Sequence, residues 1–515
     1  MSSRFPKYRL DKLAELQKLQ AGDAPDSTVF RERLRDSAPD IRTARRQAPP
    51  PGDGPQAGEE VQACVTGRVS ARRRSGKLTF LDLTDYSGSI QVMATLDGVG
   101  ESNYEIAKSA DLGDILGVRG RLGYSKSGEL TIFASQVRVL AKAMQQPPEK
   151  HHGLKDPELR ARHRTIDLYS NHDVARNFER RVLMMRTIRH YLDDRGFLEV
   201  ETPMLHPVSG GAAARPFVTH HNTLGLDLYL RIAPELYLKR LLVGGFTRVY
   251  EINRNFRNEG ISPVHNPEFT MLEVYEVNGD MISMMDLTEG LIRDTARALA
   301  AQAASEAEVE RAGGPDSRDY LHPDWRGKTY DLESPFQRVA YLDLFREHVG
   351  IDPHDSDVVR ARAIEHEIEG AAGREHWDLV GELFEHDVEA ALEGPIFVYG
   401  YPTAISPLAM RNAVDENITD RFELFVGGQE LANAFSELND PIDQRRRLEE
   451  QACMRAGTAE GESASVDEDF LLALEQGMPP AGGLGVGIDR LAMLLLGADT
   501  IRDVIFFPTV RPKEH

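Results

Sequence analysis

The stretches FRNEG at residues 256–260 and HNPEFTMLEVY at residues 265–275 decide how this chain folds. The second stretch has the pattern of a β-strand, in which successive side chains point to opposite faces. One face of that strand would carry an aromatic ring, a thioether, a carboxylate and a phenol: Phe269, Met271, Glu273 and Tyr275. Together the two stretches predict a β-hairpin, with a loop around Arg257 that can bind polyphosphate.

A second stretch, ELANAFSE at residues 430–437, repeats the alternation and places Asn433, Phe435 and Glu437 on one face. For either strand alone, a half-buried strand with its polar face in solvent is an equally good interpretation. The glycine-rich run at residues 482–487 leads into an apolar helix that begins near Arg490, and helix starts favour anions. Two acid-bearing strands and this arginine point to one shared pocket.

Three short motifs follow one another along the chain: GFLEVETP at residues 196–203, FRNE at residues 256–259 and GVGIDR at residues 485–490. In this order they are highly specific. The chain resembles the class II lysine–tRNA ligases, the bacterial-type lysyl-tRNA synthetases, from about residue 60 to its end. The resemblance implies an α+β fold, with an N-terminal OB-type β-barrel and a class II synthetase catalytic domain whose antiparallel β-sheet is flanked by helices. It also implies a homodimer.

Length, local patterns and the family resemblance together imply the domain organisation, since 515 residues are too many for one typical core. Leucines at helical spacing predict a helix at residues 10–19, and APPPGDGP at residues 48–55 indicates a linker. Five short β-like runs then predict the barrel: 61–69, 78–84, 89–94, 115–122 and 131–140. We expect an N-terminal helix and Pro-rich linker at 1–60, an OB-fold anticodon-binding domain at 61–143, an interdomain linker at 144–175 and the catalytic domain at 176–515.

The reaction that the resemblance implies is activation of L-lysine with ATP to lysyl-adenylate, followed by transfer of lysine to the 3′ end of tRNA(Lys). Such a reaction needs positioning and charge neutralisation rather than a side-chain nucleophile. Arg257 and Arg490 are the expected catalytic residues, because guanidinium groups stay charged and bind oxyanions in pairs. The ATP-binding residues that the resemblance implies are Arg257, Glu259, His265, Phe269, Glu423 and Arg490.

The cofactor that the resemblance implies is Mg²⁺, held between phosphates by Glu423 and Glu430. Outside the family, acids with this spacing would be read as surface residues. Two acids and a phenol in one pocket would surround an ammonium group, and lysine is their natural complement. The lysine-binding residues that the resemblance implies are Gly211, Glu235, Arg257, Glu273, Tyr275, Asn433, Phe435 and Glu437.

In the barrel, the positions that match the family's anticodon-reading face are Arg73, Phe80, Gln91 and Glu129. An aromatic ring can stack on a base while amide and acid groups bind base edges. Phe80 is equally well interpreted as a core residue of a small barrel. We interpret the basic runs at residues 68–77 and 160–164 as nucleic-acid contacts rather than solvated turns.

The formal net charge of -21 opposes nucleic-acid binding at long range. Salt screens charges beyond about 8 Å, so a local basic patch can still act. Cys64 and Cys453 form no disulfide or metal-ligand framework, so no structural zinc is expected. The N-terminus has no apolar run of signal or membrane length, and we expect a soluble, cytoplasmic protein.

The chain departs from the family pattern at the stretch 160–165 and at four single positions, without touching the expected ligand residues: Ala404, Met410, Asn278 and Gly279. A second hypothesis is therefore a divergent paralogue that activates lysine or a related amine for another acceptor or a specialised pathway. A third is a non-catalytic binding protein on a synthetase scaffold. The third predicts eroded ATP and metal residues, whereas Arg257, Glu423, Glu430 and Arg490 are all present.

Overall fold

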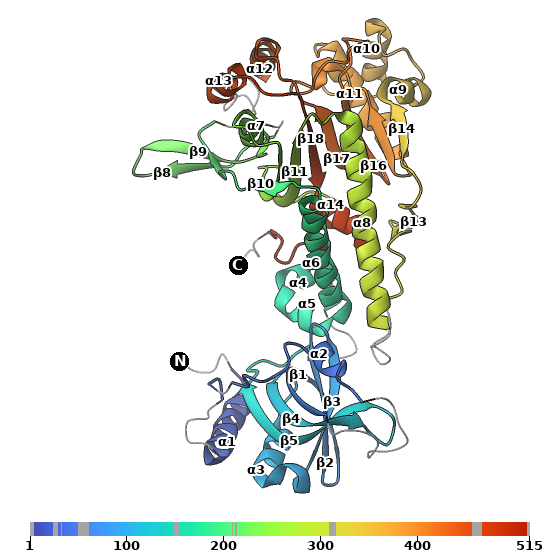
Figure 1. Cartoon of the computed structure of the whole chain (residues 1–515). Coiled ribbons are helices and arrows are strands. Elements are labelled where there is room, and N and C mark those ends of the chain that lie inside the picture. Colours follow the sequence, from blue (N-terminus) through green and yellow to red (C-terminus); the bar gives the residue numbers. More distant parts are fainter. Residues whose placement is uncertain are drawn as a thin grey trace. The chain divides into compact units, whose positions relative to one another are not determined.

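A computed structural model describes residues 5–23, 29–31, 33–49, 61–148, 154–208, 210–211, 214–307, 316–455 and 466–511 (Figure 1). The chain divides into two compact units. The first comprises Met1–Glu179 and Ala303–Ser317, and the second comprises Arg180–Gln302 and Arg318–His515. Most of the linker expected at residues 48–55 lies outside the described residues.

The first unit contains a closed barrel with the strand order β1-β2-β3-β5-β4. Its strands are β1 (Gln62–Ser75), β2 (Leu78–Asp85), β3 (Gly88–Thr95), β4 (Ile115–Tyr124) and β5 (Leu130–Ala141). The expected OB-type barrel is thus confirmed, although β1 runs further than expected and a helix, α3 (Leu96–Ser109), separates β3 from β4. Alternate residues of β2 turn inward, so Leu81 and Leu83 are fully buried in the barrel core.

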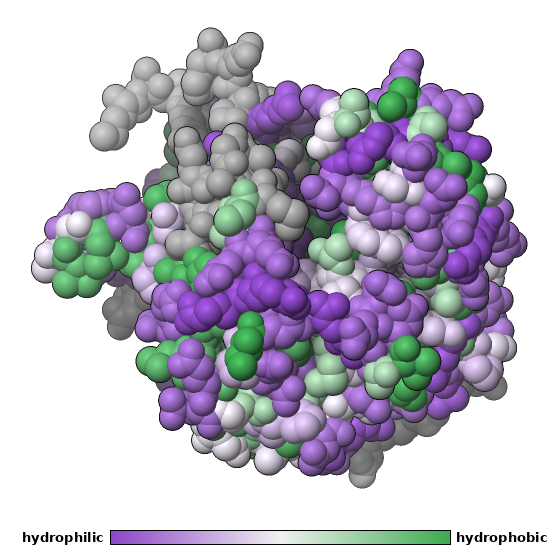
Figure 2. Space-filling view, turned by 90° about the horizontal axis from the view of Figure 1, so that it is seen from above, coloured by the Kyte–Doolittle hydropathy of each residue, from purple (hydrophilic) through white to green (hydrophobic). Residues whose placement is uncertain are grey.

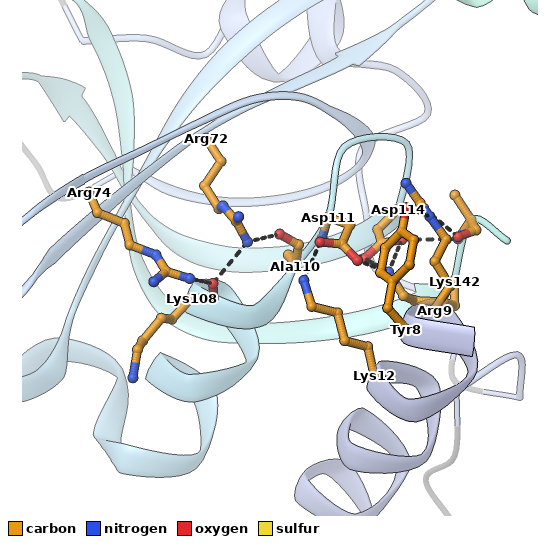
Figure 3. A network of polar contacts seen from close by, with 11 residues as sticks. Tyr8, Arg9, Lys12, Arg72, Arg74, Lys108, Ala110, Asp111, Asp114 and Lys142 are labelled. Carbon is orange, nitrogen blue, oxygen red and sulfur yellow. Dashed lines mark hydrogen bonds and ion pairs between the residues drawn. The ribbon is translucent and has the colours of Figure 1, made fainter. Parts of the chain in front are cut away.

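The segment before the barrel packs onto it through α1 (Lys7–Asp23) and α2 (Ile41–Arg45). These helices add three buried side chains to the barrel core: Leu16, Ile41 and Ala44. Asp111 forms ion pairs with Lys12 of α1 and with Lys142, which follows β5 (Figure 3). The N-terminal helix therefore shares the core of the first unit.

The basic run at residues 68–77 is largely engaged within this unit. Arg72 donates hydrogen bonds to the carbonyl oxygens of Lys108 and Ala110, and Arg74 donates to that of Lys108 (Figure 3). These carbonyls lie at the end of α3, where the last backbone acceptors have no partner within the helix. Arg72 and Arg74 thus cap a helix, which corrects the interpretation of the whole run as a nucleic-acid contact.

The region after the barrel is helical: α4 (Pro157–Arg162), α5 (Arg164–Ser170) and α6 (His172–Asp193). Arg160 Nε lies 3.0 Å from Asp167 Oδ1, and a guanidinium nitrogen of Arg164 lies 2.6 Å from Asp167 Oδ2. Because Asp167 is fully buried, these two arginines neutralise an internal acid. The basic run at residues 160–164 therefore also serves mainly to stabilise the fold.

The second unit is built on an eight-stranded sheet with the order β14-β15-β16-β17-β18-β11-β10-β6. Neighbours pair antiparallel except β14 with β15 and β10 with β6. This confirms the expected antiparallel-rich catalytic sheet. The strands are β6 (Leu198–Glu199), β10 (Arg248–Phe256), β11 (Glu268–Val277), β14 (Gln337–Ala340), β15 (Ile396–Tyr399), β16 (Arg421–Val426), β17 (Gln429–Ser436) and β18 (Ala481–Gly487).

The glycine-rich run is itself a central strand, β18, and not only an approach to the helix α14 (Ile488–Leu496). Gly483 pairs with Tyr275 of β11 on one side and with Phe435 of β17 on the other. Glycine in a strand marks a place where other groups approach the backbone closely. The glycines of β18 thus leave room for the side chains of its two neighbours.

Two departures from the family pattern form the turn after β11. Asn278 has a left-handed backbone with φ 61°, which asparagine tolerates better than most residues, and its N–H donates to Pro480 O at 2.7 Å. A Cβ on Gly279 would lie 3.0 Å from Glu276 O. Asn278 and Gly279 therefore suit this turn.

The remaining elements of the second unit surround the sheet. The helices are α7 (Glu235–Val243), α8 (Met281–Ala307, which continues into the first unit), α9 (Tyr341–Val349), α10 (Ser356–Glu365), α11 (His376–Asp387), α12 (Pro441–Arg455) and α13 (Glu468–Glu475). Short 3-10 helices are η1 (Glu389–Ala391), η2 (Thr403–Ile405) and η4 (Ile501–Asp503). Two small sheets contain β7 (Leu205–His206), β8 (Val218–His221) and β9 (Leu226–Leu230), and β12 (Asp324–Trp325) with β13 (Lys328–Thr329).

The surface seen in Figure 2 is mostly hydrophilic, in keeping with the excess of acidic residues. The hairpin of β8 and β9, at the left of that view, exposes hydrophobic side chains, including Val218 and Leu224. Within the described residues, every helix is too short or too polar to cross a membrane.

Candidate active site

A cavity of about 660 Å³ in the second unit lies along the central strands β11, β17 and β18. Every residue expected to bind ATP, lysine or magnesium lines it: Gly211, Glu235, Arg257, Glu259, His265, Phe269, Glu273, Tyr275, Glu423, Glu430, Asn433, Phe435, Glu437 and Arg490. The alternation of β11 accounts for part of this set, because its side chains at 269, 271, 273 and 275 all face the cavity. The pocket inferred from two strands and a distant arginine is therefore present.

The two expected catalytic arginines lie at one end of the cavity. The guanidinium carbon of Arg257 lies 5.1 Å from the ring centroid of Phe269, a cation–π arrangement. Arg490 donates to Glu430 O at 2.7 Å and lies 3.3 Å from His265 Nε2. Burial lowers the pKa of Arg257, and its Nε finds no hydrogen-bond acceptor in the described part of the chain. This end of the cavity therefore offers positive charge and an unused hydrogen-bond donor to an anionic ligand.

Acidic side chains gather next to these arginines. Glu423 accepts hydrogen bonds from Tyr401 OH at 2.9 Å and from Arg421 at 2.5 Å. Burial, reinforced by Glu430, nevertheless raises the pKa of Glu423 to about 7. Burial and the charge of Glu423 likewise raise the pKa of Glu389 to about 7. Crowded carboxylates of this kind fit a divalent cation, which prefers oxygen ligands and would offset their repulsion.

A second acidic group, which we call the acidic end, comprises Glu235, Glu273, Tyr275 and Glu437, with the buried Lys239 beside them. Lys239 Nζ lies 2.8 Å from Glu235 Oε1 and 2.5 Å from Glu437 Oε2. Tyr275 OH donates to Glu273 Oε2 at 3.2 Å. Burial raises the pKa of Glu273 well above its usual range, and it raises the pKa of Glu437 to about 8 despite Lys239. The acidic end therefore holds more buried acid than its own lysine neutralises.

Glu437 also has unused hydrogen-bonding capacity. Apart from the ion pair with Lys239, neither of its carboxylate oxygens meets a hydrogen-bond donor in good geometry among the residues that the structure describes. Buried polar groups are rarely left without partners. A ligand that brings a hydrogen-bond donor would satisfy them.

Three residues important to this site were not identified from the sequence: Lys239, Arg421 and Gly483. Lys239 lies four residues after Glu235 on α7, a helical spacing that could have revealed their ion pair. Arg421 lies two residues before Glu423 on β16 and also donates to Asn433 Oδ1 at 3.2 Å. Gly483 carries no local signal, because only the pairing of β18 with its neighbours brings it against Glu437.

The expected anticodon residues lie together in the first unit. Arg73 pairs with Phe80 across β1 and β2, and Gln91 Nε2 donates to Glu129 Oε2 at 2.7 Å. Phe80 is half-buried and is not one of the core residues, which include its neighbour Leu81. The alternative of a core phenylalanine is therefore wrong. Asp82, opposite Gln91 and 3.4 Å from Arg73, belongs to the same face and was not predicted.

Comparisons with known proteins cover nearly the whole chain. Residues 156–511 match the family described as tRNA synthetases class II (D, K and N), and residues 63–140 match an OB-fold nucleic acid binding domain. A lysine–tRNA ligase of Syntrophomonas wolfei is 47% identical over 516 residues, which is 99% of this chain and 98% of that protein. A lysine–tRNA ligase of Moorella thermoacetica is 50% identical over 462 residues, 89% of this chain and 90% of that protein.

Proposed function

We propose a role for each side chain of the cavity from the premise that this chain belongs to the class II tRNA synthetases and, among them, to the lysine–tRNA ligases. Its reaction is the activation of L-lysine with ATP and the transfer of lysine to tRNA. In the first step a lysine carboxylate oxygen bonds to the α-phosphorus of ATP, and pyrophosphate leaves. In the second, a ribose hydroxyl at the tRNA 3′ end attacks the lysyl carbonyl, and AMP leaves.

The end of the cavity that contains Arg257 and Arg490 binds ATP. Arg257 neutralises the lysine carboxylate and the α-phosphate as they approach, because one guanidinium can bind two oxyanions. Arg490 and His265 contact the distal phosphates. Phe269 packs against one face of adenine and Arg490 against the other, and Glu259 completes the ATP-binding set. Both arginines line the cavity, and Arg257 Nε has no acceptor among the described residues, which supports these roles.

Class II synthetases generally use Mg²⁺, and we propose Glu423 and Glu430 as its protein ligands. When bound, the ion neutralises charge on the ATP phosphates. The raised pKa of Glu423 supports this role, because a nearby cation would favour its ionised form.

The acidic end binds lysine. Lysine has two ammonium groups, and the acidic end has three carboxyl groups, of which Lys239 can offset one. Glu235, Gly211 and Asn433 receive the α-amino acid group, while Glu273, Tyr275 and Glu437 receive the side-chain ammonium. Phe435 packs beside the aliphatic stem. The match between two remaining acids and two ligand ammonium groups favours lysine over a neutral or acidic amino acid.

The first unit contacts tRNA. We propose that Phe80 stacks on an anticodon base while Arg73, Gln91 and Glu129 bind base edges or backbone. Their common position on the barrel surface supports this. A homodimer is a further part of the proposal, supported by exposed apolar side chains such as Val182, Val218 and Leu224. An enzyme of protein synthesis would act in the cytoplasm with its tRNA.

The observation that carries the proposal is the buried, under-compensated acidic end. The test is aminoacylation of tRNA(Lys) by the purified full chain with ATP, Mg²⁺ and a panel of amino acids. We expect lysine to be charged far better than arginine, ornithine, aspartate or asparagine. Pyrophosphate exchange with lysine but no charging of tRNA would contradict the second step and favour a different acceptor.

A further inference from the structure

Two histidines and an aspartate meet outside the catalytic cavity, where α10 and α11 end. His366 follows the last residue of α10, and His386 and Asp387 are the last residues of α11. His366 Nδ1 lies 3.2 Å from His386 Nδ1, and Asp387 Oδ1 lies 2.6 Å from His386 Nδ1 and 3.4 Å from His366 Nδ1. Three potential metal-ligand atoms thus converge on one point.

The spacing of these atoms fits a small transition-metal ion. Zinc binds histidine nitrogen and carboxylate oxygen at roughly 2.0–2.2 Å, so ligand atoms around a tetrahedral ion lie about 3.3 Å apart. Two of the three observed separations, 3.2 and 3.4 Å, are close to that value. The third, at 2.6 Å, joins neighbouring residues and needs only a small side-chain rotation to open.

Without a metal ion, hydrogen bonding makes the two histidines compete for one carboxylate oxygen. The two Nδ1 atoms face each other, and at most one of them can donate a proton to the other. Both also face the same oxygen of Asp387. A cation at this point would accept a lone pair from each nitrogen and from the carboxylate, so no proton has to be shared.

The backbone adds a second attraction for a cation. Helix C-termini carry partial negative charge, and here two helices of ten and twelve residues end at the same place. Apolar packing holds the two helices together, and it includes Val359 and Ala363 of α10 and Leu383 of α11. The ligand atoms therefore sit on a packed pair of helices rather than on a loose loop.

We propose that His366, His386 and Asp387 bind one Zn²⁺-like cation that links the C-terminal ends of α10 and α11. Imidazole ligands select zinc and its first-row neighbours over Mg²⁺, which prefers oxygen. The fourth ligand is water, because His386 is largely solvent-exposed. The expectation of no structural zinc considered only cysteines, whereas this site uses none. The site is distinct from the lysine-activation site, since its three ligands do not line the catalytic cavity.

The test is calorimetric titration of the metal-free full chain with Zn²⁺, in excess Mg²⁺ so that the catalytic carboxylates are occupied. We expect about one equivalent to bind at this site and to raise the melting temperature. His386→Ala and His366→Ala should each weaken that binding at least about tenfold, since even loss of a residue behind a metal ligand can cost that much. Asp387→Asn, which keeps the side-chain volume, should weaken it as well.

The matched control is His220→Ala. His220 is also exposed and lies 2.7 Å from Asp227, but no second histidine joins that pair among the described residues. This variant should bind Zn²⁺ like the wild type. Absence of Zn²⁺ binding to the wild type, or unchanged binding and melting shift in the His366→Ala, His386→Ala double variant, would overturn the proposal. Lysine charging by the same preparations tests the ligase function separately.

Discussion

Lys239 Nζ lies 2.5 Å from Glu437 Oε2, so the chain's own ammonium group lies against the acid proposed to bind the substrate ammonium. Both side chains are fully buried. Burial favours the protonated form of this carboxyl group and Lys239 favours the ionised form; burial is the larger effect and raises the pKa of Glu437 to about 8. The affinity for lysine should therefore depend on how Glu437 is compensated.

Glu437→Gln should mainly weaken lysine binding. Losing a charge-assisted hydrogen bond costs about 1.5–3 kcal/mol, which corresponds to a rise of roughly 10- to 150-fold in the KM for lysine. The KM for ATP should change little, because the phosphate-binding residues are untouched. Pyrophosphate exchange measures both constants. Glu276→Gln is the control, since Glu276 pairs with Arg248 and does not line the cavity; an unchanged lysine KM in Glu437→Gln would refute the assignment.

The KM for lysine should fall as the pH rises from 6 to 8. Burial raises the pKa of Glu437 to about 8, so most of the free enzyme holds it protonated at neutral pH. The ligand ammonium favours the ionised form, so binding releases a proton and improves by about tenfold per pH unit below pH 8. Glu273, whose pKa is also raised, acts in the same direction.

Proton release can be measured directly. Calorimetry of lysine binding in two buffers with different ionisation enthalpies should give different apparent heats at pH 7. Glu437→Gln should reduce that difference. Equal heats in both buffers would show that lysine binding exchanges no net proton, and either that result or a KM that rises with pH would contradict the prediction.

Gly483→Ala should damage the lysine site without a general loss of folding. An added Cβ would lie 1.8 Å from Glu437 Oε1 and 2.7 Å from a ring carbon of Tyr275, so both side chains must shift. Overpacking of this kind costs about 1–3 kcal/mol; when the lysine site bears that cost, it corresponds to roughly 5- to 150-fold in kcat/KM for lysine. Gly485→Ala is the matched control, because its Cβ would meet the flexible end of Met271 at 3.2 Å and lie at an ordinary contact distance of 3.7 Å from Asn433 O. Equal effects of the two substitutions on kcat/KM would argue against a special role for Gly483.

Local alternation was enough to predict much of the sheet and cavity. In β11 the side chains at 269, 271, 273 and 275 face the cavity, so the spacing of Glu273 and Tyr275 already showed that they share a face. The position of Gly483 opposite Tyr275 depends on strand pairing over some two hundred residues of sequence, which no local pattern encodes. The ion pair of Lys239 with Glu437 is equally non-local.

For the basic runs, a local pattern in the sequence led to a prediction that the structure corrects in part. Charge density in the sequence suggested nucleic-acid contacts, but Arg72 and Arg74 cap α3, a helix that the sequence pattern did not reveal. An arginine can bind a phosphate or a helix carbonyl equally well. Only the position of the neighbouring carbonyls decides between them.

Glu423→Gln should raise the Mg²⁺ concentration needed for half-maximal activity and lower kcat. Loss of one electrostatic contact to a reacting group commonly costs about 10²- to 10³-fold in kcat. Lysyl-adenylate formation as a function of Mg²⁺ measures both effects. Glu393→Gln, which removes an exposed acid paired with Lys328, should leave the Mg²⁺ dependence unchanged. A Glu423→Gln enzyme with wild-type Mg²⁺ dependence would show that Glu423 is not a ligand.

Asp489→Asn should destabilise the second unit by about 3 kcal/mol, because it leaves the buried Arg181 without its counter-ion. Asp489 Oδ1 lies 2.6 Å from a guanidinium nitrogen of Arg181, and Oδ2 accepts the backbone N–H of Thr270 at 2.7 Å. These contacts hold the start of α14, and with it Arg490, against β11. The denaturation midpoint should fall, whereas Glu199→Gln, which breaks the exposed pair with Arg189, should cost at most about 1 kcal/mol. If both variants lose a similar small amount of unfolding free energy, the buried ion pair fixes the position of Arg490 and does not stabilise the fold.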